Sequence, residues 1–356
     1  MAPNTPKYLI VERFIKREIR DQAFTGKLPG ERTLAKQLGV SYMTVRKAVD
    51  HLVAAGLLYR VPAKGTFVAD GEAPENSKHT VGYFLDSGIE QGISSPYYSL
   101  VFNSIEKEAA RHGYSVVYFS ETGKTPIREV LQRLDGVIAT CFPRVERTIE
   151  VINETLPLVV IENRASDAAI PSVVIDDFAA EVDAVGYLCS LGHSRIGFIA
   201  GLGDSDIGRN RYEGYLHGLS DHDIEPDASL VFRGDYSFEA GVDGAGHFLS
   251  LDAPPTAIVC ASDSMALGAM RRIYESNLTA PADISVIGFD DIEIAAQVSP
   301  ALTTMAAPVG EIAGRAFEML RELIDGNDMG GRHLSLAANL VIRQTCAERT
   351  ADNIAA

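Results

Sequence analysis

The sequence predicts a mixed α/β protein with a small helical head and a larger body of two lobes built on parallel sheets. Three observations lead to this prediction: the length of 356 residues, a change in charge along the chain, and a change in the periodicity of apolar residues. A chain of this length is roughly two to three times the size of one ordinary domain. A hydrophobic fraction of 46% and a charged fraction of 22% are typical of globular proteins.

Charge is distributed unevenly along the chain. Residues 1–70 contain twelve Lys and Arg against six Asp and Glu, whereas the whole chain has a net charge of −16. The head therefore carries +6 and the remainder −22. Because DNA is a polyanion, a basic end on an acidic chain predicts a nucleic-acid-binding segment joined to a body that the duplex repels. A solvated basic surface would give the same charges.

The first 69 residues follow the order of a winged helix-turn-helix. Apolar spacing predicts helices over 8–23, 29–39 and 41–56, with Ser41 as the N-cap of the third. Two β-prone runs within 58–68 then flank a turn with a basic tip, which predicts a hairpin. In such a unit the second helix of the helix-turn-helix lies in the major groove.

The segment KLPGERTLAKQLGVSYMTVRKAVDHLVAAGLLYRVPAKGTFV resembles the DNA-binding domain of GntR-type bacterial regulators over its whole length. This resemblance implies DNA contacts at Arg32, Tyr42, Thr44, Arg46, Lys64 and Gly65. The family often has Arg at the position of Tyr42, so a guanine contact made by relatives is expected to be missing. As an alternative, Arg46 and Lys47 are ordinary solvated helix charges.

Residues 70–79 are rich in Gly, Pro, Glu, Asn and Ser, which predicts a linker between the head and the body at 80–345. Beyond the linker, apolar runs of strand length alternate with helical segments in two series. This alternation predicts two lobes, each with a parallel sheet covered on both faces. The first series ends with Leu158–Ile161, and the second is expected to begin with Val173–Ile175.

Polar residues follow the predicted strands, and ligands of open α/β sheets bind beyond the carboxyl ends of strands. Carboxylates accept hydrogen bonds from hydroxyls and guanidinium groups donate them, so this composition predicts a polyol site. The polar residues after strands or at the start of a helix are Asp86, Glu162, Asn163, Arg164, Asp176, Asp177, Arg209, Arg211, Ser262, Asp263, Asp290 and Asp291. As an alternative, Asp177, Asp263 and Asp291 each cap a helix.

Residues 80 to about 345 resemble the effector domain of LacI-type regulators, a relative of periplasmic sugar-binding proteins. The segments SLGHSRIGFIAG, GRNRYEGYLHGL, IVCASDSMALGAM, APADISVIGFDDIEIA and SPALTTM occur in the order that this family uses. The resemblance implies an effector site made of Tyr97, Tyr98, Asn163, Arg164, Arg211, Tyr236, Ser262 and Asp290. The tyrosine rings would cover the apolar side of a sugar.

Two positions depart from the LacI-type pattern. Asn163 stands where many relatives have Asp, and Ser262 where many have Asn, so the pattern does not identify the sugar. A GntR-type head on a LacI-type body is similar to arabinose-responsive repressors, but arabinose does not follow from this likeness. The expected function is that of a sequence-specific transcriptional repressor. A small sugar or polyol would release it from operator DNA.

The expected protein is a cytoplasmic homodimer with no cofactor, metal, membrane partner or catalytic residues. The N-terminal segment carries charges where a signal peptide is apolar, and no run is long enough to span a membrane. Four widely spaced cysteines are expected to be small buried hydrophobic residues. The competing hypotheses are a free solute-binding protein and a sugar-binding or sugar-modifying α/β enzyme. The enzyme hypothesis lacks GxSxG, a Walker lysine and a complete dinucleotide motif, because position 206 is Asp206.

Overall fold

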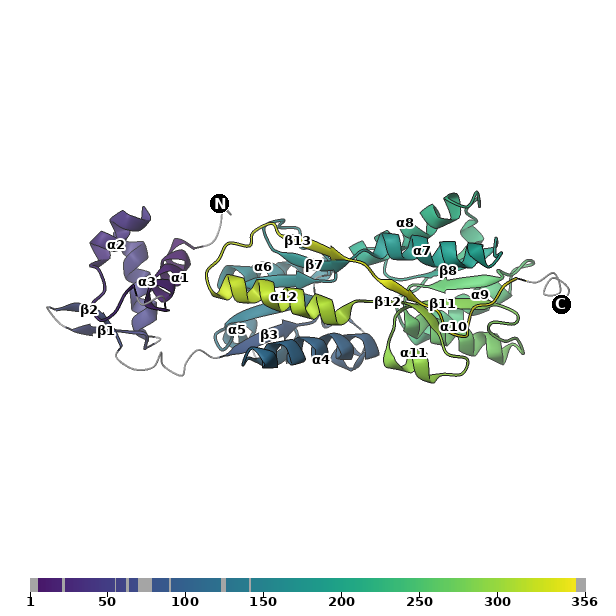
Figure 1. The fold of residues 1–356 in the computed structure, drawn as a ribbon, viewed down its shortest axis with the longest axis horizontal. Helices are drawn as coiled ribbons and strands as arrows, with labels where there is room; N and C mark the ends of the chain where they lie inside the picture. Colours follow the sequence, from purple (N-terminus) through teal and green to yellow (C-terminus); the bar gives the residue numbers. More distant parts are fainter. Residues whose placement is uncertain are drawn as a thin grey trace.

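A computed structural model describes residues 6–20, 23–54, 56–61, 64–69, 79–89, 91–122, 126–140 and 142–349. Figure 1 shows a small head followed by two α/β lobes along the long axis. The predicted linker lies outside the described residues except for its last residue, His79. Within the described part of the chain, no helix has the length and apolar character needed to cross a membrane.

The head is a winged helix-turn-helix with its own apolar core. Its elements are α1 (Lys7–Arg20), α2 (Glu31–Leu38), α3 (Tyr42–Ala54), β1 (Leu58–Val61) and β2 (Gly65–Val68). The two strands pair antiparallel, and Gly39 ends α2 in the left-handed conformation at φ 64°. Ile15, Leu34 and Leu52 meet in the core, so one face of each helix is buried and the opposite face stays exposed.

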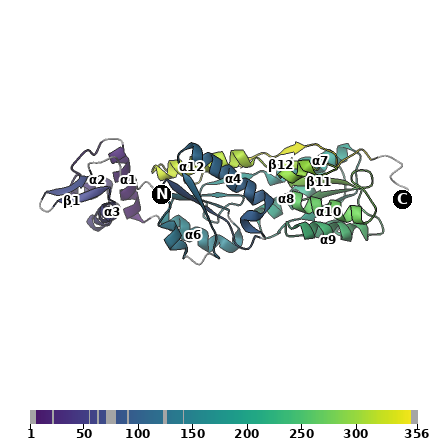
Figure 2. The same cartoon turned by 90° about the horizontal axis from the view of Figure 1, so that it is seen from below.

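The first lobe has a six-stranded parallel sheet in the order β13-β7-β6-β5-β3-β4. Its strands are β3 (Thr80–Phe84), β4 (Ser115–Phe119), β5 (Gly136–Thr140), β6 (Leu158–Ile161), β7 (Ser172–Ile175) and β13 (His333–Leu336). Its helices are η1 (Gly92–Ser94), α4 (Pro96–Arg111), α5 (Ile127–Leu131), η2 (Pro143–Val145), α6 (Glu146–Thr155) and α12 (Val309–Ile324). Figure 2 shows α4 and α12 on one side of this sheet and α6 on the other.

The second lobe has the strand order β14-β12-β11-β10-β8-β9, and only β14 runs antiparallel among these described strands. Its strands are β8 (Ile196–Ala200), β9 (Val231–Arg233), β10 (Ala257–Cys260), β11 (Ser285–Asp290), β12 (Thr303–Ala306) and β14 (Asn339–Val341). Its helices are α7 (Asp177–Ser190), α8 (Asp206–Ser220), η3 (Ala228–Leu230), α9 (Phe238–Leu249), α10 (Asp263–Glu275) and α11 (Glu293–Gln297). The close helix pairs α7–α8 and α9–α10 cover opposite faces (Figures 1 and 2).

The chain passes between the lobes three times, at Asp176, between β12 and α12, and between β13 and β14. The assignment of Val173–Ile175 to the second lobe was wrong, because β7 pairs with β6 and β13 of the first sheet. The cysteine prediction was also partly wrong. Cys260 is buried, whereas Cys189 and Cys346 are half-buried, and Cys141 lies outside the described residues.

Candidate functional site

The recognition helix α3 begins at a local cap. The backbone N–H of Thr44 donates to Ser41 Oγ at 3.1 Å, and the two hydroxyl oxygens lie 2.7 Å apart. Val45 and Val49 point into the core of the head. Five of the six predicted DNA-contact residues are exposed: Arg32, Tyr42, Arg46, Lys64 and Gly65. The sixth, Thr44, is half-buried and bonded to Ser41.

Most cations near α3 already have partners within the head. Lys47 Nζ lies 3.9 Å from the centre of the Tyr8 ring. Arg60 donates to Glu31 at 2.9 Å and contacts Asp50 at 2.5 Å. Arg46, by contrast, is exposed and makes no hydrogen bond or ion pair with another described residue. Its guanidinium is therefore available to an external acceptor such as a phosphate or a base edge.

The wing has a second cation that the sequence analysis did not single out. Lys27 forms a β-bridge with Phe67, so the segment before α2 lies beside β2. Gly65 has φ 121°, and a Cβ at this position would lie 2.9 Å from Lys27 Cε. The absence of a side chain at Gly65 therefore lets the Lys27 side chain lie across the wing, near Lys64. In the sequence, the only sign that Lys27 belongs to the wing was its place at the start of the GntR-type segment.

The carboxyl ends of the two sheets face each other, and polar side chains occupy the space between them. Asn163 follows β6 in the first lobe, and its Oδ1 accepts a hydrogen bond from the backbone N–H of Ile207, in α8 of the second lobe, at 3.3 Å. Asn163 Nδ2 is buried without a hydrogen-bond partner among the described residues. Buried donors nearly always have a hydrogen-bond partner, so this Nδ2 group is a candidate donor to a ligand bound between the lobes.

Arg211 is the central cation of this region. The residue is 4% exposed, its Nε donates to Asp177 Oδ1 at 2.7 Å, and its Nη1 donates to the Ala261 carbonyl at 2.6 Å. Its Cζ lies 3.4 Å from the centre of the Phe289 ring. Burial alone would lower the pKa of Arg211, but nearby carboxylates, first Asp177, raise it well above its ordinary value. Arg211 therefore stays charged.

The first lobe contributes a paired tyrosine and carboxylate. Tyr97 Oη donates to Glu162 Oε1 at 2.6 Å, and the rings of Tyr97 and Tyr98 pack edge to face at 5.2 Å. Burial raises the pKa of Glu162 to about 7, although the Tyr97 hydrogen bond opposes this shift. Both tyrosines begin α4, so a helix fixes their positions at the edge of the lobe.

The second lobe contributes Asp290 and Tyr236, both in unusual backbone conformations. Asp290 has φ 120° and Tyr236 has φ 70°, values that favour glycine and mark strain. Burial raises the pKa of Asp290 well above its ordinary value, and its carboxylate accepts no hydrogen bond from another described residue. A Cβ at Gly201 would lie 2.0 Å from Tyr236 Cζ, so only glycine permits this position of the Tyr236 ring.

Asp177, Asp263 and Asp291 make fixed contacts, but none of these three acids caps a helix. Asp176 caps α7 in place of Asp177. Ser262 caps α10 in place of Asp263: its Oγ accepts from the Met265 N–H at 3.2 Å. Asp263 instead accepts from the Ile292 N–H at 2.9 Å and the Thr304 hydroxyl at 2.6 Å. Asp291 accepts from Arg343 at 2.6 Å, which fixes the C-terminal segment.

The structure brings together all the predicted effector residues except Arg164, whose side chain is exposed. It also adds three buried acids to the predicted set: Glu162, Asp177 and Glu181. Glu162 and Asp177 had been identified as polar residues at strand ends, but Glu181 had not. Its spacing of four residues from Asp177, on the same face of α7, was the available signal.

The buried carboxyl of Glu181 should make the stability of the protein depend on pH. Burial raises its pKa to about 8 from 4.5, and neither carboxylate oxygen has a hydrogen-bond partner among the described residues. Between these values the folded protein holds a proton that the unfolded chain releases, so stability falls as pH rises and levels off above about pH 8. Glu162 and Asp263, raised to about 7, act in the same direction.

Glu181→Gln should remove the contribution of Glu181. From pH 5 to pH 9, the free energy of unfolding of the wild type should fall by about 4 kcal/mol relative to that of the variant. Urea unfolding across this range measures the difference. Parallel pH profiles for the two proteins would contradict the assignment of the proton to Glu181.

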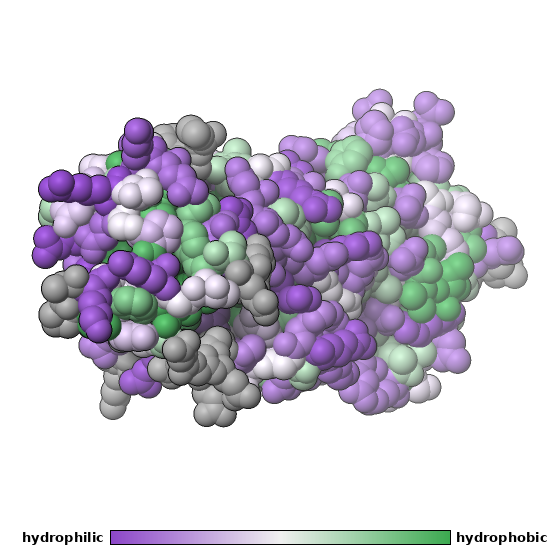
Figure 3. All heavy atoms as spheres, turned by 60° about the vertical axis from the view of Figure 1, so that its left-hand side comes forward, coloured by the Kyte–Doolittle hydropathy of each residue, from purple (hydrophilic) through white to green (hydrophobic). Residues whose placement is uncertain are grey.

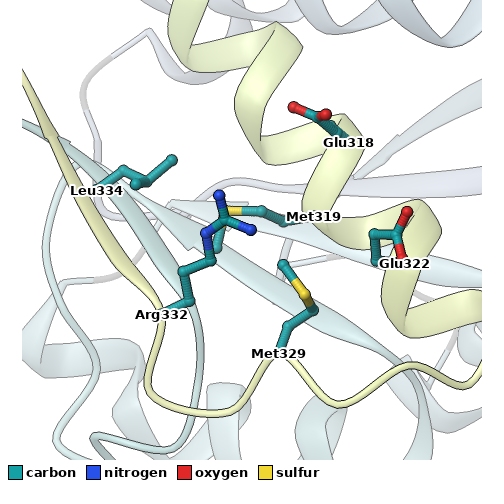
Figure 4. Close-up of a pocket in the computed structure, with 6 residues that line it drawn as sticks. All are labelled: Glu318, Met319, Glu322, Met329, Arg332 and Leu334. Atoms are coloured by element: carbon teal, nitrogen blue, oxygen red, sulfur yellow. The ribbon is translucent and has the colours of Figure 1, made fainter.

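A separate cavity lies outside this cluster. Figure 4 shows it between α12 and the segment leading into β13, with the Arg332 side chain projecting toward Met319. It lies on the first lobe and is lined by none of the predicted effector residues. It is therefore not the predicted effector site.

Comparison with known proteins gives two family matches. Residues 7–68 match the gntR family of bacterial regulatory proteins, and residues 185–346 match the periplasmic binding protein-like domain. The HTH-type transcriptional repressor CytR of Escherichia coli K12 is 35% identical over 263 residues, which cover 72% of this chain and 77% of CytR. The probable repressor ExuR of Bacillus subtilis is 31% identical and covers 69% of this chain and 74% of its own.

Solved structures agree with these matches. A LacI-family regulatory protein from Chloroflexus aggregans superimposes with a TM-score of 0.64 at 28% identity, covering 76% of this chain and all of that protein. The Escherichia coli repressor ascG gives a TM-score of 0.64 at 26% identity and covers 75% of this chain and 99% of its own. All four of these proteins are named as repressors or regulatory proteins. The chain therefore belongs to the LacI family of transcriptional regulators, with a gntR-family DNA-binding domain as its head.

Proposed function

We propose that this protein is a repressor that leaves its operator when a small neutral sugar or polyol binds between the two lobes. The relatives CytR and ExuR are named as repressors, which supports repression over activation. The head reads the operator through Arg32, Tyr42, Thr44, Arg46, Lys64 and Gly65. The effector site consists of Tyr97, Tyr98, Asn163, Arg211, Tyr236, Ser262 and Asp290, without the exposed Arg164.

One observation supports the effector site most directly: unpartnered polar groups from both lobes converge on the same space. Among the described residues, Asn163 Nδ2 in the first lobe and the Tyr236 hydroxyl in the second are buried and have no hydrogen-bond partner. A ligand with hydroxyl groups satisfies both at once. Because it then bonds to both lobes, it binds one arrangement of the lobes better than another, and this difference in affinity shifts the equilibrium.

The charges of the site favour a neutral ligand over an anionic one. Arg211 is the one buried Lys or Arg among the described residues, and four buried acids lie near it: Glu162, Asp177, Glu181 and Asp290. Arg211 is already bonded to Asp177. A phosphate or a carboxylate would therefore add negative charge to a buried site without a free cation to neutralise it.

We further infer that the regulator acts in the cytoplasm as a homodimer. A helix-turn-helix dimer presents two recognition helices to a two-fold operator, so operator symmetry matches protein symmetry. Closure of the lobes would change the spacing of the two heads. Sedimentation of the full chain, with and without operator, tests the dimer, and a monomer bound to a single half-site would contradict it.

The function is tested by a thermal-shift screen of the full chain followed by an operator-release assay. Pentoses, hexoses and deoxysugars are compared with uronic acids and sugar phosphates. A true effector at 100 times its Kd should stabilise the protein by about 2.7 kcal/mol. The same compound should then release labelled operator DNA. A screen in which only anionic sugars stabilise the protein would contradict the proposed ligand class.

A further inference from the structure

Two large apolar side chains lie exposed at the start of the recognition helix. Met43 is 66% exposed and Tyr42 is 39% exposed, and both belong to the first turn of α3. Single exposed apolar residues are common, but this pair occupies the end of the helix that meets base edges in helix-turn-helix proteins. Figure 3 shows apolar side chains among hydrophilic ones on the head. We propose that Met43 reads the 5-methyl group of one thymine in each operator half-site.

Helical spacing directs Met43 outward together with Arg46. Residues 43, 46, 47 and 50 share one face, while Val45 and Val49 are buried in the core. Along this face, the Lys47 ammonium lies over Tyr8 and Asp50 pairs with Arg60. Met43 and Arg46 are thus the members of the face that have no partner among the described residues.

The chemistry of Met43 selects its target in the groove. A thioether side chain has no hydrogen-bond donor, so it cannot bond to the acceptors of guanine. The major groove presents one apolar group, the thymine methyl, which apolar side chains contact. Methionine is flexible and polarizable, so it adapts its shape to this methyl. Tyr42, with its hydroxyl, is better suited to a phosphate contact.

The proposal rests on the DNA-reading function of the head and is tested with the full chain. A preferred operator is first selected from random duplexes without effector. Each thymine is then replaced by uracil, which removes only the methyl group, and Kd is measured by fluorescence anisotropy. At one position per half-site we expect binding to weaken about fourfold, the value for one buried methyl-sized group. In Met43→Ala that replacement should have no effect, whereas Met43→Leu should keep the sensitivity.

Tyr42→Ala is the matched control, because it changes the adjacent exposed side chain and should retain the uracil effect. Thermal unfolding confirms that each variant folds, as expected for side chains outside the core. The proposal is overturned if no thymine is sensitive to uracil, or if the sensitivity persists in Met43→Ala. A wild-type protein that selects no sequence would overturn the DNA-reading function together with the proposal.

Discussion

Arg211→Ala should abolish effector-induced release of the operator and lower the free energy of unfolding by about 3–5 kcal/mol. The large cost arises because Asp177 is buried and would lose the guanidinium that bonds to it at 2.7 Å. The ring of Phe289 would also lose its contact with the guanidinium at 3.4 Å. Urea unfolding measures the stability, and anisotropy of labelled operator with increasing sugar measures the response.

Asp290→Asn separates loss of effector binding from loss of folding. The Asp290 carboxylate accepts no hydrogen bond from another described residue, so its replacement leaves the fold intact. Effector affinity should still fall about 2- to 10-fold, since a hydrogen bond between uncharged groups is worth about 0.5–1.5 kcal/mol. If either variant released operator at the wild-type sugar concentration, its residue would not belong to the effector site.

Arg46→Ala should weaken operator binding by about 1–3 kcal/mol for each half-site, and sugar binding should not change. Arg46 is exposed on α3 and has no partner in the described part of the head, so the substitution removes a contact to DNA and no contact within the protein. Anisotropy at several salt concentrations distinguishes the type of contact, because loss of a phosphate contact also reduces the dependence of affinity on salt.

Arg147→Ala is the matched control for Arg46→Ala. Arg147 is 86% exposed on α6 of the first lobe, so the control removes the same charge far from the recognition helix. It should leave operator affinity within error of the wild type. Equal weakening by the two substitutions would indicate a general effect of net charge and would remove Arg46 from the DNA interface.

The winged helix-turn-helix was predictable because its signals are local. Ser41 caps α3 and Gly39 ends α2 as the sequence indicated, and these positions depend only on neighbouring residues. The assignment of β7 to the first lobe, by contrast, could not be predicted from local signals. A buried parallel strand has the same apolar composition in either lobe, and only its hydrogen bonds to β6 and β13 decide between them.

The polar cluster between the lobes was predictable as a set of strand ends, but its individual contacts were less predictable. Arg211, Tyr236 and Asp290 gather because the carboxyl ends of parallel strands lie at one edge of a sheet. The position of Glu181 depends on the close packing of α7 against α8. A Cβ at Gly214 of α8 would lie 2.9 Å from Glu181 Cβ, and this contact between helices leaves no pattern of its own in the sequence.

The three passages of the chain between the lobes make each lobe discontinuous in the gene. The first lobe takes α12 and β13 from beyond residue 308, and α12 packs on α4 and on strands β5 and β6. A fragment that ends at Asp176 would expose that apolar face and leave β7 with an open edge. Expressed alone it would aggregate, so a split version of this regulator needs both fragments made together in the same cell.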